Sequence, residues 1–247
     1  MRQWLDKRYW LVGASEGLGR ALAERMSGAG VELVLSARNP DRLQTLAESL
    51  PGRAQAVPVD VRDTNSVRAA AQSAGDIDGV VYLAGAYWPQ PAQEWDSAQV
   101  ETMCDVNFTG AARVLGAVVP AMVARGVGHV VLTGSLAGFR GLPGAIGYGA
   151  SKAGLMHLAE SMQADLRGSG IEVQLVNPGF IRTRLTDRNS FRMPFIMEPE
   201  TAAALMFDHM GTNRFKKSFP ALFSGLFRFS QFLPDWAYFR LFAPRRR

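Results

Sequence analysis

The heptapeptide Gly13-Ala14-Ser15-Glu16-Gly17-Leu18-Gly19 joins an apolar run, Tyr9–Val12, to a helical pattern that begins at Arg20. Glycine lets the backbone turn sharply and approach another group closely. A helix that starts directly after such a turn points free N–H groups and the positive end of its dipole at an anion. The heptapeptide therefore predicts a phosphate-binding turn. Its spacing, Gly-x-x-x-Gly-x-Gly, differs from the commoner Gly-x-Gly-x-x-Gly, and a purely structural tight turn is the alternative.

Further short apolar runs alternate with helical patterns along the chain. These runs are Val31–Ser36, Gln55–Val59, Gly79–Leu83, His129–Thr133 and Glu172–Val176. Continuously apolar runs fit strands that are buried on both faces of a parallel sheet. The stretches between them, such as 19–29 and 100–125, fit crossover helices. The alternation predicts an α/β fold, with a doubly wound parallel sheet and helices on both faces.

Composition sets limits on the class of protein. A chain of 247 residues with 47% apolar and 20% charged residues can bury one large core, which argues for one domain and against global disorder. Asp6, Lys7 and Arg8 interrupt any apolar export signal, and the apolar stretch 114–124 contains Pro120 and is shorter than the roughly 20 residues of a membrane span. The single cysteine, Cys104, fits a reducing compartment. We expect a cytoplasmic protein.

Positive charge is concentrated at the C-terminus. Residues 211–247 contain eight Lys or Arg and one acid, Asp235, a net charge of +7. Because the whole chain carries +5, the first 210 residues carry −2. The body is therefore not basic, which argues against nucleic-acid binding.

The same C-terminal segment is rich in phenylalanine. Eight of the 14 Phe residues lie between Phe215 and Phe242, and the first four, at 215, 219, 223 and 227, are spaced by four. Pro220 and Pro234 each suit a first helical turn. We predict a C-terminal helical extension over 211–247, after a dinucleotide-binding and catalytic domain over 1–210. The extension could pack on the body, cover a second subunit of a homo-oligomer, or rest on an anionic membrane with Arg245-Arg246-Arg247.

A second motif that carries chemistry is Tyr148-Gly-Ala-Ser-Lys152, at the start of a predicted helix that continues through Leu155 and Leu158. Residues four apart lie on one helical face, so the ammonium of Lys152 lies near the phenol of Tyr148. A nearby positive charge favours the phenolate and lowers the pKa of Tyr from its ordinary value of about 10. The pair therefore predicts a proton donor and acceptor, with an exposed helical pair as the alternative.

Four more motifs follow in order, and they are Leu83-Ala84-Gly85-Ala86, Val106-Asn107, Gly134-Ser135 and Asn177-Pro178-Gly179 with Thr183. Together with the glycine turn and the Tyr148–Lys152 pair, they resemble the classical short-chain dehydrogenases/reductases over about residues 8–200. The resemblance implies a Rossmann-type domain, a nicotinamide cofactor, and reversible hydride transfer between a carbonyl and an alcohol. Two positions depart from the family pattern: Val12 stands where Thr is frequent, and Leu83 stands where Asn commonly precedes Ala-Gly.

The resemblance also implies roles for four catalytic residues. Tyr148 would be the general acid in reduction and the base in oxidation. Lys152 would bind the nicotinamide ribose and lower the pKa of Tyr148. Ser135 would hydrogen-bond the substrate oxygen, and Asn107 would hold a proton-relay water. Alternatively, Ser135 caps a turn and Asn107 satisfies a bend in a helix.

Cofactor preference is indicated after the second apolar run, in Leu35-Ser36-Ala37-Arg38-Asn39. An NAD site places a carboxylate here for the ribose 2′-hydroxyl, and Ala37 provides none. Arg38 offers a planar cation for a 2′-phosphate, so we predict NADP(H), with a merely solvated Arg38 as the alternative. We predict no metal. By resemblance, the other cofactor residues are Gly13, Ser15, Glu16, Gly17, Leu18, Gly19, Asp60, Val61, Ala84, Gly85, Asn107, Tyr148, Lys152, Pro178, Gly179, Ile181 and Thr183.

The substrate is indicated only by class. A substrate loop of about 183–197, together with Tyr87-Trp88-Pro89 and Phe139, follows strand ends where such sheets build clefts. Its Phe, Met and Ile side chains suit a carbonyl or alcohol with an apolar body, although packing under a lid explains them equally well. The prediction is an NADP-dependent oxidoreductase. The alternative is an NADP-binding regulatory or scaffold protein with little turnover.

Overall fold

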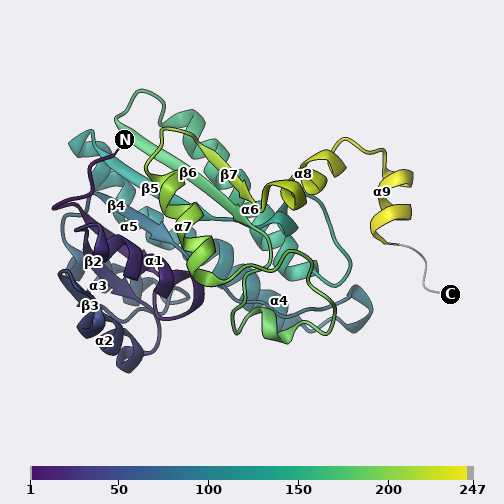
Figure 1. The fold of residues 1–247 in the computed structure, drawn as a ribbon, viewed down its shortest axis with the longest axis horizontal. Helices are drawn as coiled ribbons and strands as arrows, with labels where there is room; N and C mark the ends of the chain where they lie inside the picture. Colours follow the sequence, from purple (N-terminus) through teal and green to yellow (C-terminus); the bar gives the residue numbers. More distant parts are fainter. Residues whose placement is uncertain (1, 244–247) are drawn as a thin grey trace.

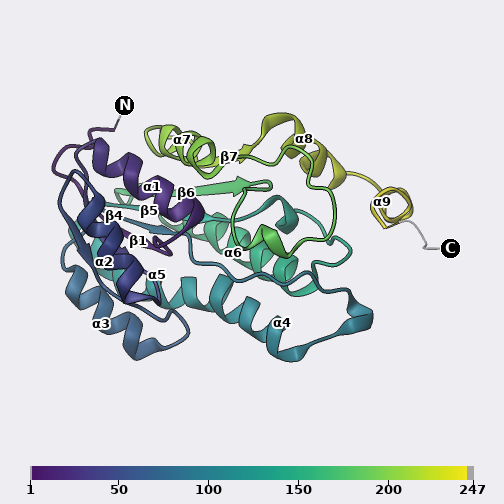
Figure 2. The same cartoon turned by 60° about the horizontal axis from the view of Figure 1, so that its bottom comes forward.

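A computed structural model describes residues 2–243 and shows a parallel sheet between two layers of helices (Figure 1, Figure 2). The seven strands run in the order β3-β2-β1-β4-β5-β6-β7. Their bounds are β1 Arg8–Val12, β2 Glu32–Ser36, β3 Ala54–Ala56, β4 Gly79–Tyr82, β5 Gly128–Thr133, β6 Ile171–Pro178 and β7 Lys216–Phe219. All neighbouring strands pair in parallel, which confirms the predicted doubly wound α/β fold.

Two helical layers cover the sheet. One face carries α1 Gly17–Gly28, α2 Pro40–Ser49 and α7 Pro199–Met210, and the other carries α3 Thr64–Ala74, α4 Ser97–Cys104, α5 Gly110–Arg125 and α6 Ile146–Asp165. Successive residues of β1 alternate between the two cores: Tyr9 and Leu11 face α1, whereas Trp10 and Val12 face the α3–α6 layer. Both sets are fully buried, which explains why the run is continuously apolar.

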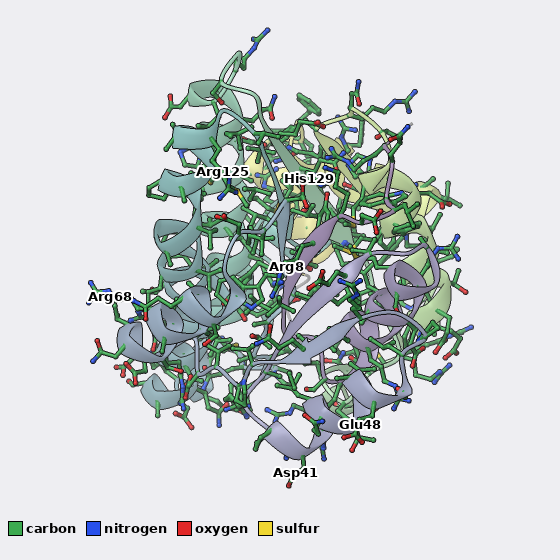
Figure 3. All side chains as sticks on the ribbon, turned by 90° about the vertical axis from the view of Figure 1, so that its left-hand side faces the viewer. Arg8, Asp41, Glu48, Arg68, Arg125 and His129 are labelled. Atoms are coloured by element: carbon green, nitrogen blue, oxygen red, sulfur yellow. The ribbon has the colours of Figure 1, made fainter. Side chains whose placement is uncertain are left out.

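Figure 3 views the sheet from the left-hand side of Figure 1, with Arg68 and Arg125 on one helical layer and Asp41 and Glu48 on α2 of the other. His129 lies between the layers, on β5, and has no exposed surface. Its Nδ1 lies 2.9 Å from the Tyr9 hydroxyl, and its Nε2 lies 3.0 Å from Oε1 of Gln174. Burial lowers the pKa of His129 to about 3, so the ring is neutral in the folded protein at neutral pH.

The C-terminal extension differs in part from the prediction. Residues 216–219 form strand β7, which pairs with β6, so the sheet extends past the predicted boundary at residue 210 and the extension is not wholly helical. Helices α8 (Ala221–Ser230) and α9 (Asp235–Phe242) follow Pro220 and Pro234, as expected. The predicted spacing of four therefore describes a helical face only from Phe223 onward. Arg245-Arg246-Arg247 lies outside the described residues.

The helical run 97–125 is longer than the sequence suggested. A π-helical turn, Asp105–Thr109, joins α4 to α5, and Pro120 lies inside α5 without ending it. By length and composition alone this run could cross a membrane, with a mean hydropathy of 1.4 in its most apolar window, 39% of which is buried. In this fold α5 packs on α3, and α4 packs on α6. The run is thus a covering layer of the sheet.

Candidate active site

The glycine turn after β1 is a close-packed junction. Gly13 has φ +99°, and a Cβ on it would lie 2.4 Å from the backbone nitrogen of Ala84 at the end of β4. A Cβ on Gly19 would lie 2.0 Å from the carbonyl oxygen of Gly13. No side chain fits at either position, so the close packing of the turn depends on glycine at both. The two departures from the family pattern meet here, where the Leu83 N–H donates to the Val12 carbonyl at 2.8 Å.

The same turn contacts the loop after β6. Gly17, with φ +49°, lies so close to Thr183 that a Cβ would be 2.6 Å from the Thr183 methyl group. The structure therefore brings the glycine turn together with Ala84 and Thr183, although these residues lie up to 170 positions apart in the chain. The remaining predicted residues lie at the carboxyl ends of the same strands, with Ser15 and Leu18 after β1, Gly85 after β4, Pro178 at the end of β6, and Gly179 and Ile181 just beyond it.

Arg38 follows β2 and is exposed. It lies close enough to Asp60 for its charge to help lower the pKa of that carboxyl, although hydrogen bonding from Arg62 is the larger cause. Arg62 donates to Asp60 at 2.7 Å. Val61, beside Asp60, is buried against the helix that carries Gly110. The predicted adenine-side residues Arg38, Asp60 and Val61 are thus neighbours.

Glu16 belongs to an ion cluster that the sequence did not indicate. Its carboxylate pairs with Arg42, on α2, and with Arg184, in the predicted substrate loop. These arginines are separated from Glu16 by 26 and 168 positions, and no motif marks either of them. The cluster connects the phosphate-binding turn to the loop after β6.

Tyr148 and Lys152 lie on the first turns of α6. The Lys152 ammonium is 5.9 Å from the centroid of the Tyr148 ring and donates to the Thr133 carbonyl at 2.8 Å. Burial lowers the pKa of Lys152 to about 8. Burial also raises the pKa of Tyr148 above its ordinary value, and a hydrogen bond with the Ser135 side chain acts in the opposite direction. The net shift of Tyr148 is opposite to the lowering predicted from its spacing to Lys152, because burial of the phenol outweighs the favourable interactions.

Ser135 and Asn107 are both buried and both have structural partners. The Ser135 hydroxyl accepts from the Ala137 N–H at 3.2 Å and lies near enough to Tyr148 to lower the pKa of that phenol. Asn107 lies in the π-helical turn, where its Oδ1 accepts from the Ala86 N–H at 2.7 Å and its Nδ2 donates to the Ala86 carbonyl at 3.0 Å and to the Ser151 hydroxyl at 2.9 Å. Asn107 therefore fixes the backbone of the loop after β4. Its predicted relay water stays a prediction.

Two loops meet beside Tyr148. The Tyr87 ring packs edge-on against the Tyr148 ring, with centroids 4.9 Å apart. The Tyr87 hydroxyl donates to Asn189 Oδ1 at 2.6 Å, and Arg188 donates to the Tyr87 carbonyl at 3.0 Å. The substrate loop predicted over 183–197 thus lies against the segment that begins at Tyr87.

Apolar side chains border the same region. Leu136, directly after Ser135, packs with Phe223 and Phe227 of α8, and Phe139, Leu142 and Phe180 adjoin this cluster. Phe180 and Phe195 each lie within 6 Å of the Phe223 ring, at 5.9 and 5.5 Å between centroids. Nothing in the sequence places Phe180 or Phe223 in this region, because one follows a strand, the other lies in the C-terminal extension, and no motif connects them.

Comparison with known proteins gives a consistent result. The family model described as short chain dehydrogenase matches residues 7–192. An uncharacterized oxidoreductase of Myxococcus xanthus is 39% identical over 232 residues, covering 91% of this chain and 92% of its own. Sulfoacetaldehyde reductase 2 of Chromohalobacter salexigens is 38% identical over 184 residues, covering 71% of this chain and 73% of its own.

Solved structures have the same fold. A short-chain dehydrogenase from Sphingobium yanoikuyae in complex with NADPH superposes with a TM-score of 0.81 at 27% identity, covering 98% of this chain and 97% of its own. One from Burkholderia cenocepacia in complex with NADP has a TM-score of 0.86 at 23% identity, covering 98% and 99%. One from Burkholderia phymatum in complex with NAD has a TM-score of 0.84 at 24% identity, covering 92% and 94%. Because the two Burkholderia proteins are less than 25% identical to this chain, their similarity shows the fold alone.

Proposed function

The chain belongs to the short-chain dehydrogenase family and is an oxidoreductase, and we propose that it uses NADP(H) to interconvert a carbonyl and an alcohol with an apolar body. One observation carries this proposal. The Tyr148 phenol lies near Ser135, with its ring centroid 5.9 Å from the Lys152 ammonium, on the helix that follows β5 and at the sheet edge where the glycine turn also lies. A proton donor and a phosphate-binding turn at one edge suit a nicotinamide enzyme.

The residues present fit a dinucleotide. Glycine at 13 and 19 lets the chain turn sharply, so α1 begins directly after β1 and its N-terminus would face a pyrophosphate. Ala84 after β4, Thr183 after β6 and Lys152 on α6 would hold the nicotinamide half. When bound, the cofactor supplies or accepts the hydride.

In reduction, Ser135 and Tyr148 would both donate hydrogen bonds to the carbonyl oxygen of the substrate. Negative charge builds on this oxygen as the carbonyl carbon is reduced, and the two hydroxyls stabilise it. The raised pKa of Tyr148 keeps the phenol protonated at neutral pH, so it can give its proton to the oxygen. The Lys152 ammonium lies close enough to stabilise the phenolate that remains.

Preference for NADP(H) is supported by the charges at the adenine end. Asp60 is paired with Arg62, and Glu16 with Arg42 and Arg184, so both nearby carboxylates are already neutralised. Among the described residues, Arg38 forms no ion pair and is exposed beside Ala37, which carries no carboxylate. An unpaired guanidinium favours a 2′-phosphate over a hydroxyl. The relative from Sphingobium yanoikuyae was solved with NADPH, which agrees with this proposal.

The cofactor proposal predicts that the protein binds NADPH more tightly than NADH. Arg38→Ala should weaken NADPH binding by about 1.5–3 kcal/mol, or roughly ten- to a hundredfold, and leave NADH binding nearly unchanged. The measurement is titration of each nucleotide by fluorescence. Arg53→Ala is the matched control. Arg53 is also exposed, but it precedes β3 and so lies at the amino ends of the strands, away from the carboxyl ends where Arg38 lies. A parent protein that prefers NADH would contradict the Arg38 argument.

The reaction is tested by a panel of aldehydes, ketones and alcohols of graded apolar size, followed by NADPH absorbance. The sulfoacetaldehyde reductase relative makes short aldehydes a useful reference, and the aromatic cluster beside Ser135 predicts better kcat/KM for longer apolar carbonyls. Binding of NADPH without turnover of any compound would favour the alternative, a regulatory or scaffold protein.

A further inference from the structure

Helices α8 and α9 extend from the body beyond the carboxyl end of β7, and both views place them at the margin of the molecule (Figure 1, Figure 2). One side of α8 packs on the body through Phe223 and Phe227, each only 9% exposed. Of the placements that the sequence left open for the extension, packing on the body is therefore observed for this side of α8. The other side of the two helices is also apolar, and it is exposed.

The exposed side is dense in large apolar residues. Of the 15 exposed large hydrophobic residues in the described chain, seven lie between 222 and 241. We call these seven the outer face, and they are Leu222, Leu226, Phe229, Phe232, Trp236, Phe239 and Leu241. On α8, Leu222, Leu226 and Phe229 are spaced as i, i+4 and i+7, which places them on one stripe. When a helix packs on the protein core with one apolar side, a second apolar side that is exposed indicates that it contacts another apolar surface.

The outer face is held in a defined position. Arg140, in the loop after β5, donates to the carbonyl oxygens of Ser230 and Leu233 at 2.7 Å each and to Asp235 at 2.5 Å. Its guanidinium stacks 4.0 Å from the centroid of the Tyr238 ring. The Tyr238 hydroxyl donates to the Gly141 carbonyl at 2.6 Å. These contacts fix α9 and the α8–α9 turn to the loop that follows Ser135, so the exposure of the outer face is built into the fold.

Charge identifies the kind of surface that the outer face fits. Arg228 and Arg240 are exposed on the same two helices and form no ion pair within residues 2–243. The only acid of segment 211–247, Asp235, is engaged by Arg140. An apolar face flanked by unpaired arginines matches the acyl boundary and the negative headgroups of an anionic lipid surface. A second copy of this chain would present the same positive charges and would be repelled.

The substrate side of the site contacts α8 through the side of that helix that packs on the body. Aromatic rings lead from Phe191 through Phe180 to Phe223, and from Phe223 through Phe227 to Phe242, with centroids 5.0 to 6.3 Å apart. Phe195 of the substrate loop contacts Phe223 and is itself exposed. The substrate loop therefore lies next to α8, the helix that carries part of the outer face.

We propose that the outer face of α8 and α9 rests on an anionic lipid surface and holds the substrate side of the enzyme against it. The apolar carbonyl or alcohol then reaches the site from the lipid. The membrane contact itself does not depend on the proposed cofactor or reaction, so it is tested by binding alone.

The test is co-sedimentation of the full chain with vesicles of phosphatidylcholine alone or mixed with phosphatidylglycerol. We expect binding to the mixed vesicles, weaker binding at high salt, and a blue shift of tryptophan emission that Trp236→Phe removes without removing binding. Leu222→Ser/Leu226→Ser/Phe229→Ser should abolish binding. Arg228→Gln/Arg240→Gln, which alters no packed side chain, should weaken it on the order of thirtyfold.

The matched control is Trp95→Ser/Val127→Ser, which removes two exposed apolar residues outside the extension and should bind like the parent. Circular dichroism and melting temperature check that each variant is folded. Absence of binding by the folded parent would overturn the proposal, as would binding that survives the triple serine variant. A parent dimer in analytical ultracentrifugation that this variant converts to monomer, without vesicle binding, would assign the outer face to a second copy instead.

Discussion

Gly13 is restricted in two ways, by its own backbone conformation and by the close approach of the backbone at the end of β4. Its φ of +99° is strained for any other residue, and the atoms that a side chain would strike belong to the backbone of Ala84, which cannot rotate away. The packing of β1 against the end of β4 therefore depends on the absence of a side chain here.

Gly13→Ala should weaken NADPH binding at least tenfold and lower stability by about 2 kcal/mol, because the turn must shift away from Ala84. Nucleotide titration and chemical denaturation measure the two effects. Gly116→Ala is the control, since a Cβ at this exposed position of α5 meets nothing within 4 Å, and alanine should leave binding unchanged there and raise stability slightly. Parent-like NADPH affinity in Gly13→Ala would contradict the role given to the turn.

At this scale the sequence predicted the positions of side chains in the fold better than their pKa shifts and ion pairs. The spacing of Tyr148 and Lys152 correctly placed both on one helix, but it gave no measure of burial, and burial decides the direction of both pKa shifts. Likewise, the position of Glu16 in the turn was evident, whereas its arginine partners depend on how α2 and the loop after β6 fold back. Long-range neighbours of this kind leave no local periodicity.

Among the elements, α9 depends most on a single side chain. Arg140 provides its hydrogen bonds to the α8–α9 turn, its ion pair with Asp235 and its stacking on Tyr238. The preceding helix, α8, is held in addition by the buried side chains of Phe223 and Phe227. The two helices should therefore respond differently to loss of Arg140.

Arg140→Ala should loosen α9 and its connection to α8 by about 1–3 kcal/mol, while the sheet stays intact. Hydrogen exchange should become at least fivefold faster in residues 231–242 and change little in α8. Arg125→Ala is the control, because Arg125 also pairs with an acid, Asp76, and donates to a backbone carbonyl, that of Ile77, but lies on α5. Unchanged exchange in α9 would show that Arg140 does not hold it.

The element that the sequence missed is β7. Its residues, Lys216-Lys217-Ser218-Phe219, contain a single apolar side chain, whereas every residue of the central strands β4 and β5 is buried. An edge strand is buried on fewer sides, so its sequence carries a weaker signal. The four-residue spacing of Phe215 and Phe219 then resembled a helical face. Strands β1, β2, β4, β5 and β6 are buried on both sides and were predicted to within two residues at each end.

For the whole molecule, the buried His129 links stability to pH. Its folded pKa of about 3 lies below the unfolded value of about 6.5, so the unfolded chain binds more protons between these two pH values. Stability should thus be fully present above pH 6.5 and fall as the pH is lowered through this window. From pH 7 to pH 5, His129 alone should account for about 2 kcal/mol of that loss.

Urea denaturation at pH 7 and pH 5 measures this dependence. His129→Gln, although less stable at pH 7, should lose less stability on acidification than the parent does. His157→Gln is the control and should behave like the parent, because His157 is exposed on α6. The same loss in the parent and in His129→Gln would exclude His129 as the source.

The central claim, that Tyr148 moves the proton of a carbonyl reduction at this site, is tested most directly by the turnover of Tyr148→Phe. This variant removes one hydroxyl and keeps the ring that packs edge-on against Tyr87. With the best carbonyl of the panel, kcat should fall at least a thousandfold, on the order expected for removal of a general acid, while NADPH affinity stays within about twofold of the parent value. Parent-like kcat in Tyr148→Phe would contradict the account.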